Sequence, residues 1–235
     1  AAFHAARQGG RQAGEGRQGG VSDRYREVGY ASSEIGGGRR PAVLVVDFQV
    51  AFTDPQYPLG GLPLIHAARD RTAALLAIAR SRKVPVAACF TAYCSPADMP
   101  LWKVKGVRDA FYYGHPCTAM DPKIHHPDVV TYCKNAPSMF FQTPLITFLV
   151  KQGVDTVIVT GCTTSVCVDS TIRDAVFRDY RCVLLEDCTA EPIGQNSPRS
   201  NHEASVLVVR TLLGWTSSSD EFIRALESPG ASNSG

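Results

Sequence analysis

The sequence predicts an α/β fold in which a mainly parallel sheet is covered by helices on both faces. Short runs of β-branched and aliphatic residues alternate along the chain with longer segments whose apolar residues recur at helical spacing. Strands and helices that alternate in this way form parallel sheets, because each helix returns the chain to the edge where the next strand begins. The chain has 235 residues and is 44% hydrophobic, which is long enough for one such domain with a sizeable core.

The expected strands are short apolar runs, and most of the expected helices lie between them. The strands cover residues 42–46, 86–90, 129–133, 155–160 and 181–186, with a short edge strand at 215–216. The helices cover residues 64–82, 143–152, 168–176, 200–213 and 219–226. Gly153 is a stop signal for the second of these helices, and Ser219 is the expected N-cap of the last. The segment 98–127 is irregular and aromatic, and it is a candidate lid or oligomer contact.

The first 39 residues differ in composition from the rest of the chain. The segment 1–38 holds ten of the twenty glycines, mixed with arginine and glutamine. Such a segment has too little apolar surface to pack, so we expect residues 1–39 to form a disordered tail. The excess of arginine over acidic residues within 1–20 is faintly similar to an organelle transit peptide, and a processed tail is the alternative. The folded domain then covers 40–227, followed by a flexible tail at 228–235.

Composition disfavours several classes of function. The net charge of +2 gives no electrostatic reason to expect binding to nucleic acid or to a membrane surface. No apolar run approaches the length of a transmembrane helix. The eight cysteines form no Cys-x-x-Cys pair, and no histidine pair lies near them at zinc-ligand spacing, so we expect neither a metal nor a cofactor. Free thiols are typical of a reducing compartment, so we expect a cytoplasmic protein.

Cys167 carries the most functional information in the sequence. It lies in the segment 157–175, where a β-branched run is followed by glycine, then by threonine and serine, then by apolar residues at helical spacing. We therefore place Cys167 near the N-terminus of a helix, where backbone N–H groups and the positive end of the helix dipole converge. We expect this environment to lower the pKa of the thiol and to stabilise an oxyanion. The alternative is a small buried hydrophobic residue, and position alone does not separate the two.

Asp47 and Lys134 each follow another predicted strand directly. Ligands bind at the carboxyl ends of the strands in an open parallel sheet, so we expect Asp47, Lys134 and Cys167 to converge at one edge. An acid, a base and a nucleophile at that edge form a catalytic set. Taken singly, Asp47 is equally well explained as a helix cap and Lys134 as a solvated surface lysine. The coincidence of three such residues at strand ends favours catalysis.

Three segments in this order resemble the isochorismatase-like cysteine hydrolase superfamily, which includes N-carbamoylsarcosine amidohydrolase, maleamate amidohydrolase and the nicotinamidases. The first is Val45-Val46-Asp47-Phe48-Gln49 with Phe52 following, the second is 134–145, and the third is 161–175. The similarity covers roughly residues 40–227. It implies a three-layer α/β/α sandwich around a six-stranded, mainly parallel sheet, and usually a homo-oligomer, either a dimer or a tetramer.

The resemblance also implies a role for each residue of the site. Asp47 takes the thiol proton and later protonates the leaving amine, Cys167 attacks the substrate, and Lys134 holds Asp47 anionic. The backbone N–H groups of Thr163 and Cys167 form the oxyanion hole, and a cis peptide bond joins Cys162 to Thr163. Water then hydrolyses the resulting thioester, with Asp47 as the base.

Substrate contacts are less well defined by the sequence. The candidates are Phe52, Trp102, Phe140 and Thr164. The segment 101–111 resembles the corresponding part of N-carbamoylsarcosine amidohydrolase, which holds a substrate carboxylate with an arginine whose position corresponds to Pro192 here. The cations that could replace this arginine are Arg199, Lys103, Lys105 and Arg108, each of which is more often a solvated surface charge.

The resemblance predicts a metal-independent cysteine amidohydrolase that cleaves an amide or ureido bond of a small molecule and releases ammonia. The Asp-x-His metal site of the nicotinamidases is missing from the segment 91–95, which argues against a metal. One alternative is a hydrolase of the same fold that cleaves an ether or ester bond. The other is a non-catalytic binding protein, which the intact set of Asp47, Lys134 and Cys167 disfavours. We expect a small-molecule substrate, with neither nucleic acid nor a membrane as a partner.

Overall fold

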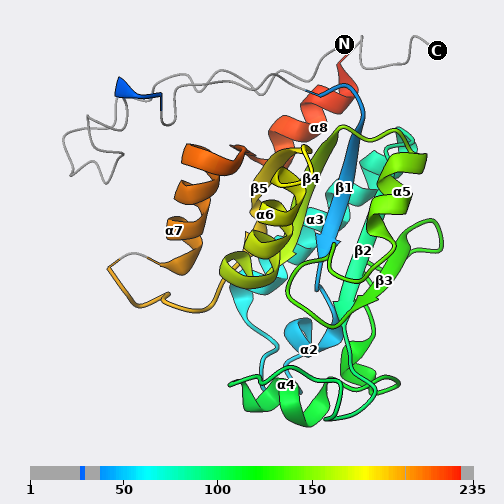
Figure 1. Ribbon diagram of the computed structural model, residues 1–235, viewed down its shortest axis with the longest axis vertical. Helices are drawn as coiled ribbons and strands as arrows, with labels where there is room; N and C mark the ends of the chain where they lie inside the picture. The colour runs from blue at the N-terminus through cyan, green and yellow to red at the C-terminus, as the bar shows by residue number, and fades with distance from the viewer. Residues whose placement is uncertain (1–26, 30–37, 199, 229–235) are drawn as a thin grey trace.

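The computed structural model describes residues 27–29, 38–198 and 200–228. The predicted tails at 1–39 and 228–235 fall largely outside these described residues, and so does Arg199. The described chain forms one six-stranded sheet with the strand order β3-β2-β1-β4-β5-β6 (Figure 1). Every neighbouring pair of strands is parallel. The predicted α/β fold with a six-stranded parallel sheet is therefore confirmed.

The elements follow the predicted order. The strands are β1 (Pro41–Val46), β2 (Val86–Thr91), β3 (Val130–Lys134), β4 (Thr156–Cys162), β5 (Arg181–Ala190) and β6 (Trp215–Ser217). The helices are α2 (Val50–Thr53), α3 (Pro63–Ser81), α4 (Lys105–Ala110), α5 (Leu145–Lys151), α6 (Asp169–Val176), α7 (Asn201–Val208) and α8 (Ser219–Glu227). π-helical turns at Thr164–Val168 and Val209–Leu213 adjoin α6 and α7. None of the helices in the described ranges is both long enough and apolar enough to cross a membrane.

Helices cover both faces of the sheet, because the central strands are apolar on both sides. In β1, Leu44 and Val46 pack into the core beneath α5 and α6, whereas Val43 and Val45 pack into the core beneath α3 and α8 (Figure 1). Side chains of a strand alternate between the two faces of the sheet. A strand that is buried on both faces therefore has a continuous run of apolar residues in its sequence. The result is the three-layer sandwich that the resemblance implies.

The strand order places the carboxyl ends of β1 and β4 at the point where the direction of winding reverses. The chain moves from β1 to β2 and β3 on one side, and then returns to add β4, β5 and β6 on the other. Ligands of open α/β sheets bind at this switch point. Asp47 follows β1, and the turn that carries Cys167 follows β4, so both lie at this position.

The structure corrects three of the predictions about secondary structure. The segment 98–127 is not wholly irregular, because Val107 and Phe111 bury against Tyr93 and stabilise α4. β5 runs to Ala190 rather than to residue 186, continuing past a shift in its register with β4. The N-cap of the last helix is Ser218, whose extended backbone lets its hydroxyl accept from the N–H of Glu221.

Gly161 allows β4 to approach β1 at the edge of the sheet that carries the site. Its φ is +122°, and a Cβ placed on it would lie 2.0 Å from the carbonyl oxygen of Val46. A side chain at this position therefore meets both an unfavourable backbone conformation and a fixed backbone atom.

We expect Gly161→Ala to lower the free energy of unfolding by more than about 3 kcal/mol, because the clash adds to the conformational penalty. Gly114→Ala is the matched control, since Gly114 also has a positive φ of +80° but a Cβ placed on it would meet no atom within 4 Å. This control should lose only about 1 to 2 kcal/mol. Urea unfolding measures both, and equal losses in the two variants would contradict the close-packing argument.

Candidate active site

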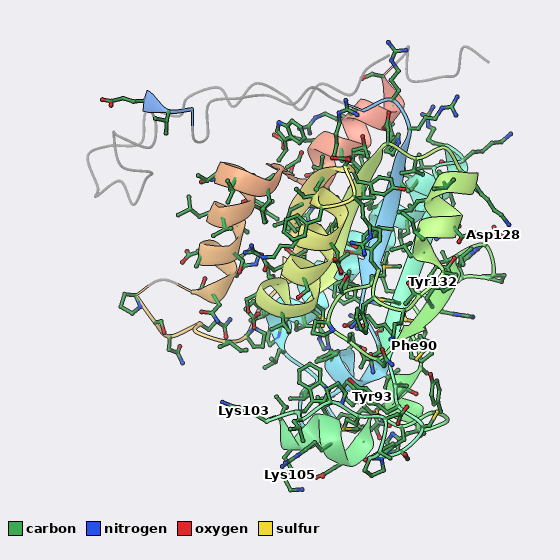
Figure 2. The ribbon with its side chains drawn as sticks, viewed as in Figure 1. Phe90, Tyr93, Lys103, Lys105, Asp128 and Tyr132 are labelled. Carbon is green, nitrogen blue, oxygen red and sulfur yellow. The ribbon has the colours of Figure 1, made fainter. Side chains whose placement is uncertain are left out.

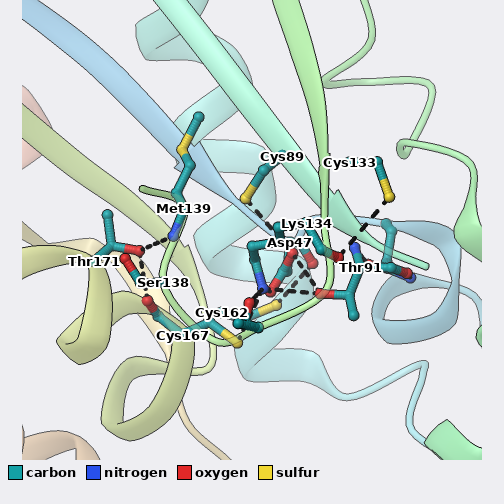
Figure 3. A network of polar contacts seen from close by, with 12 residues as sticks. Asp47, Cys89, Thr91, Cys133, Lys134, Ser138, Met139, Cys162, Cys167 and Thr171 are labelled. Carbon is teal, nitrogen blue, oxygen red and sulfur yellow. Dashed lines mark hydrogen bonds and ion pairs between the residues drawn. The ribbon is translucent and has the colours of Figure 1, made fainter. Parts of the chain in front are cut away.

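Asp47, Lys134 and Cys167 lie together at the carboxyl edge of the sheet (Figure 3). Nζ of Lys134 lies 2.8 Å from Oδ2 of Asp47 and donates to the Cys167 sulfur at 3.5 Å. The three residues come from the ends of β1 and β3 and from the turn after β4. The structure thus brings together the residues that the sequence singled out, and their chemical roles stay predictions.

Lys134 is a buried cation rather than a solvated surface lysine. It is 2% exposed, and besides Asp47 its ammonium donates to the Thr91 hydroxyl at 2.8 Å and to the Ala136 carbonyl at 3.1 Å. Burial acts to lower the pKa of Lys134, but the negative charge of Asp47 outweighs it and holds the pKa above its usual value. Lys134 therefore stays charged at neutral pH.

Asp47 is buried, and its backbone adopts a conformation that is unusual for an L-residue. It is 1% exposed and has a φ of +53°, a region in which aspartate is more common than most side chains. Its Oδ1 accepts from the Thr91 hydroxyl at 3.4 Å and from the Cys89 thiol at 3.7 Å. Its backbone carbonyl accepts from the Cys162 thiol at 3.1 Å. Asp47 is therefore a fixed carboxylate and not a helix cap.

The pKa of Cys167 is raised to about 12, so the expectation of a lowered pKa is wrong. Burial of the sulfur is the largest cause; Lys134 lowers the pKa, and the carboxylate of Asp47 raises it. Cys167 as a residue is only partly buried, but its sulfur points toward the buried pair of Asp47 and Lys134 (Figure 3). The helix also begins with a π-helical turn at Thr164, so Cys167 is not in its first position. The resting side chain of Cys167 is therefore a thiol, and the predicted role as a nucleophile would require a base.

The backbone around Cys167 is fixed from two directions. The peptide bond between Cys162 and Thr163 is cis, and the Thr163 carbonyl accepts from the N–H groups of Val166 at 3.1 Å and Val168 at 3.3 Å. On the other side, the Thr171 hydroxyl donates to the Cys167 carbonyl at 2.7 Å. The N–H groups of Thr163 and Cys167, the predicted oxyanion donors, belong to this ordered turn.

A second polar cluster adjoins the nucleophile turn. Glu191 accepts from the backbone N–H of Ser165 at 3.0 Å and from its hydroxyl, and the Thr164 hydroxyl lies 2.9 Å from Nδ1 of His202. Burial lowers the pKa of His202, so its ring is neutral near pH 7. Thr164 is buried, and its hydroxyl already has His202 as one partner, so its expected contact with substrate stays a prediction.

Three residues of these clusters were missed by sequence reasoning. Thr91 ends β2 and Glu191 directly follows β5, so each lies at a strand end, where the same signal identified Asp47 and Lys134. Both were overlooked because the predicted strands stopped too early. His202 lies on α7 in an exposed-looking polar stretch, and no sequence signal marks it.

Two of the remaining aromatic candidates stay possible substrate contacts, and one does not. The ring of Phe52 packs edge-on against Phe111, and the Trp102 indole donates to the Tyr93 hydroxyl at 2.7 Å. Phe140 is buried in the core, where its ring lies 6.2 Å from that of Tyr180. Tyr180 precedes the start of β5, at the opposite edge of the sheet, so the prediction that Phe140 contacts substrate is wrong.

Three of the four predicted carboxylate-binding cations lie on the surface, and the fourth, Arg199, is outside the described residues. Lys103, Lys105 and Arg108 are exposed, and Lys105 pairs with Asp109 of its own helix. Lys103 and Lys105 lie at the periphery of the segment around α4 (Figure 2). Within the residues that the structure describes, no three or more His, Cys, Asp or Glu side chains form a group able to hold a metal ion.

This fold is that of an isochorismatase-like hydrolase. The chain belongs to the isochorismatase family, because a family model described as "Isochorismatase domain" matches residues 41–221. Maleamate amidohydrolase of Pseudomonas putida is 35% identical over 170 residues, which cover 69% of this chain and 78% of that protein. Ureidoacrylate amidohydrolase RutB of an Enterobacter species is 36% identical over 110 residues, which cover 47% of this chain and 46% of the relative.

Solved structures agree with the assignment. A cysteine hydrolase from Pseudomonas syringae superposes with a TM-score of 0.74 at 28% identity, covering 80% of this chain and 93% of the other. N-carbamoylsarcosine amidase from Thermoplasma acidophilum superposes with a TM-score of 0.65 at 24% identity, covering 77% and 97% of the two chains. At that identity the second match supports the fold alone.

We expect the rate of Cys167 alkylation by iodoacetamide to keep rising with pH beyond pH 9, because the thiol titrates above its usual range. Asp47→Asn should speed this alkylation near pH 7, and Lys134→Ala should slow it, since the two charges shift the thiol pKa in opposite directions. Mass spectrometry of the Cys167 peptide after short pulses gives the rates, with the exposed Cys94 as an internal reference. A plateau below pH 8 would contradict the raised pKa.

Proposed function

We propose that this protein is a metal-independent cysteine amidohydrolase that cleaves an amide or ureido C–N bond of a small molecule and releases ammonia. The observation that carries the proposal is the buried cluster in which Lys134 lies 2.8 Å from Asp47 and 3.5 Å from the Cys167 sulfur. A protonated thiol beside a fixed carboxylate and a permanent cation has the parts needed for nucleophilic acyl transfer. The amidohydrolase names of two relatives support the same class of bond.

The first half of the reaction forms a thioester. Asp47 takes the proton of the Cys167 thiol, and the sulfur bonds to the carbonyl carbon while the carbonyl π electrons move to oxygen. The N–H groups of Thr163 and Cys167 stabilise this oxyanion. When the oxyanion collapses, the C–N bond breaks, Asp47 passes its proton to the nitrogen, and ammonia leaves. Lys134 compensates the charge of Asp47 each time the carboxylate is deprotonated.

The second half regenerates the enzyme. Water attacks the thioester carbon while Asp47 accepts one of its protons, and the C–S bond then breaks. The sulfur recovers a proton from Asp47, so the site returns to its resting state. Bonds and protons balance with water as the only co-substrate, and nothing is oxidised or reduced.

Two observations favour different substrates within this class. The motifs resemble those of N-carbamoylsarcosine amidohydrolase, whereas the relative with 35% identity is named for maleamate. We therefore propose a small amide or ureide that carries a carboxylate, to be resolved by direct comparison of N-carbamoylsarcosine, maleamate and ureidoacrylate. The description of the matching family model favours a second candidate, the cleavage of an ether or ester bond at the same site.

We expect Cys167→Ser to lower kcat for ammonia release at least about a thousandfold, because a hydroxyl is a much weaker nucleophile beside the same base. Asp47→Asn should lose about a hundredfold to ten-thousandfold, since it removes both the base and the proton donor. Cys94→Ser, which changes an exposed cysteine, is the matched control and should keep full activity. EDTA should have no effect.

The assay measures ammonia from the three compounds, with circular dichroism to show that each variant is folded. Full activity in Cys167→Ser, or loss of activity with EDTA, would overturn the mechanism. Release of an alcohol from an ester or ether, with no ammonia from any amide or ureide, would transfer the assignment to the second candidate.

A further inference from the structure

Glu191 is a buried carboxylate that the proposed mechanism does not use. It directly follows β5, it is 2% exposed, and no Lys or Arg within the described ranges forms an ion pair with it. Its partners are neutral donors: the N–H of Ser165 at 3.0 Å, the Ser165 hydroxyl, and the N–H of Ile193 at 3.0 Å. A buried acidic side chain rarely lacks a charged partner, so the position of Glu191 calls for an explanation.

The contact with Ser165 lies at the start of the helix that carries the nucleophile. Ser165 is two residues before Cys167 and two residues after the cis bond that ends at Thr163. Thr163 is the N-cap residue of this helix, yet its side chain makes no capping hydrogen bond. The carboxylate of Glu191, 26 residues further along the chain, takes the exposed N–H of Ser165 instead.

The N-termini of α7 and α8 differ from that of the helix that carries Cys167. α7 and α8 each begin with a local capping box, in which the backbone N–H of the N-cap serine donates to a glutamate three residues on, at 3.0 Å. At the nucleophile helix, a capping box would engage the N–H of Thr163, one of the two predicted oxyanion donors. The residue three positions on is Val166, which offers no acceptor, so that N–H is not drawn into a capping box.

We propose that Glu191 is a positioning residue that caps the nucleophile helix from the end of β5, so that the turn is fixed while the Thr163 N–H stays directed to the substrate oxygen. The inference rests on the proposed function and adds a residue to it. His202, bonded to Thr164, is a second anchor on the same turn. Because the oxyanion forms only as sulfur attacks, the cap should affect kcat more than KM.

β5 also supplies a matched control. Asp187 accepts from the backbone N–H of Ser219 at 2.8 Å and from its hydroxyl, and thereby caps α8, which carries no residue of the site. Glu191→Gln and Asp187→Asn each replace a carboxylate that accepts from a backbone N–H at the start of a helix. The first helix carries Cys167, and the second, α8, carries no residue of the site.

We expect Glu191→Gln to lower kcat about tenfold to a hundredfold with KM changed less than about threefold, and Asp187→Asn to leave both within about twofold. Glu191→Ala should lose more than Glu191→Gln, whose amide oxygen can still accept one hydrogen bond. Equal kcat in Glu191→Gln and Asp187→Asn, or a change confined to KM, would overturn the proposal. If Glu191→Gln does not fold, Ser165→Ala removes the hydroxyl contact with Glu191 and keeps the backbone N–H. It should lower kcat about twofold to fivefold at constant KM, and a change confined to KM would overturn the proposal.

A substrate-free measurement separates this inference from the proposed function. Glu191→Gln should speed alkylation of Cys167 by iodoacetamide severalfold at pH 8, because a nearby negative charge is removed and the turn is loosened, whereas Asp187→Asn should not. If the wild-type protein hydrolyses no amide or ureide, the proposed function fails while this rate still reports on the cap. Identical alkylation rates in wild type and Glu191→Gln would overturn the positioning role.

Discussion

The ion pair between Lys134 and Asp47 is the interaction on which the site depends. Both side chains are almost completely buried, so each charge is tolerated only because the other lies 2.8 Å away and the remaining polar atoms are bonded. Lys134 at the end of β3 reaches across β2 to Asp47 at the end of β1, and Thr91 of β2 bridges them. Removing either partner would strand a buried charge, at a cost of about 3 to 5 kcal/mol. The pair therefore locks three adjacent strand ends as well as placing a base.

The same pair decides the state of the nucleophile. Burial and Asp47 keep the proton on Cys167, while Lys134 alone favours the thiolate. A cysteine near the start of a helix is often activated by the helix dipole, but here burial of the sulfur and the charge of Asp47 outweigh any such activation. The site thus holds a protonated thiol beside a carboxylate, and in the proposed reaction Asp47 takes the thiol proton as the sulfur attacks.

The sequence predicted the residues that end an apolar run, because the end of a parallel strand and the position of a ligand are linked by the topology. Asp47 and Lys134 were found in this way, and Thr91 was missed only because its strand was predicted one residue too short. Phe140 was wrongly predicted to contact substrate because its motif contains both core residues and site residues. Only the fold shows that its ring lies toward the opposite edge of the sheet. The predicted direction of the Cys167 pKa shift was wrong because burial is its largest cause. The residues that bury the sulfur are distant in the sequence, so the local motif does not reveal them.

Glu191 is the clearest case of a site residue that the sequence motifs do not contain. The segment 161–175 contains the nucleophile and the cis bond, but it does not contain its own helix cap. β5 supplies two carboxylates, Asp187 to α8 on one face of the sheet and Glu191 to the nucleophile helix on the other. The reactive turn is therefore held by Glu191 at the end of β5 as well as by its own local hydrogen bonds. In the proposed reaction, this arrangement leaves the N–H of the N-cap residue for the oxyanion.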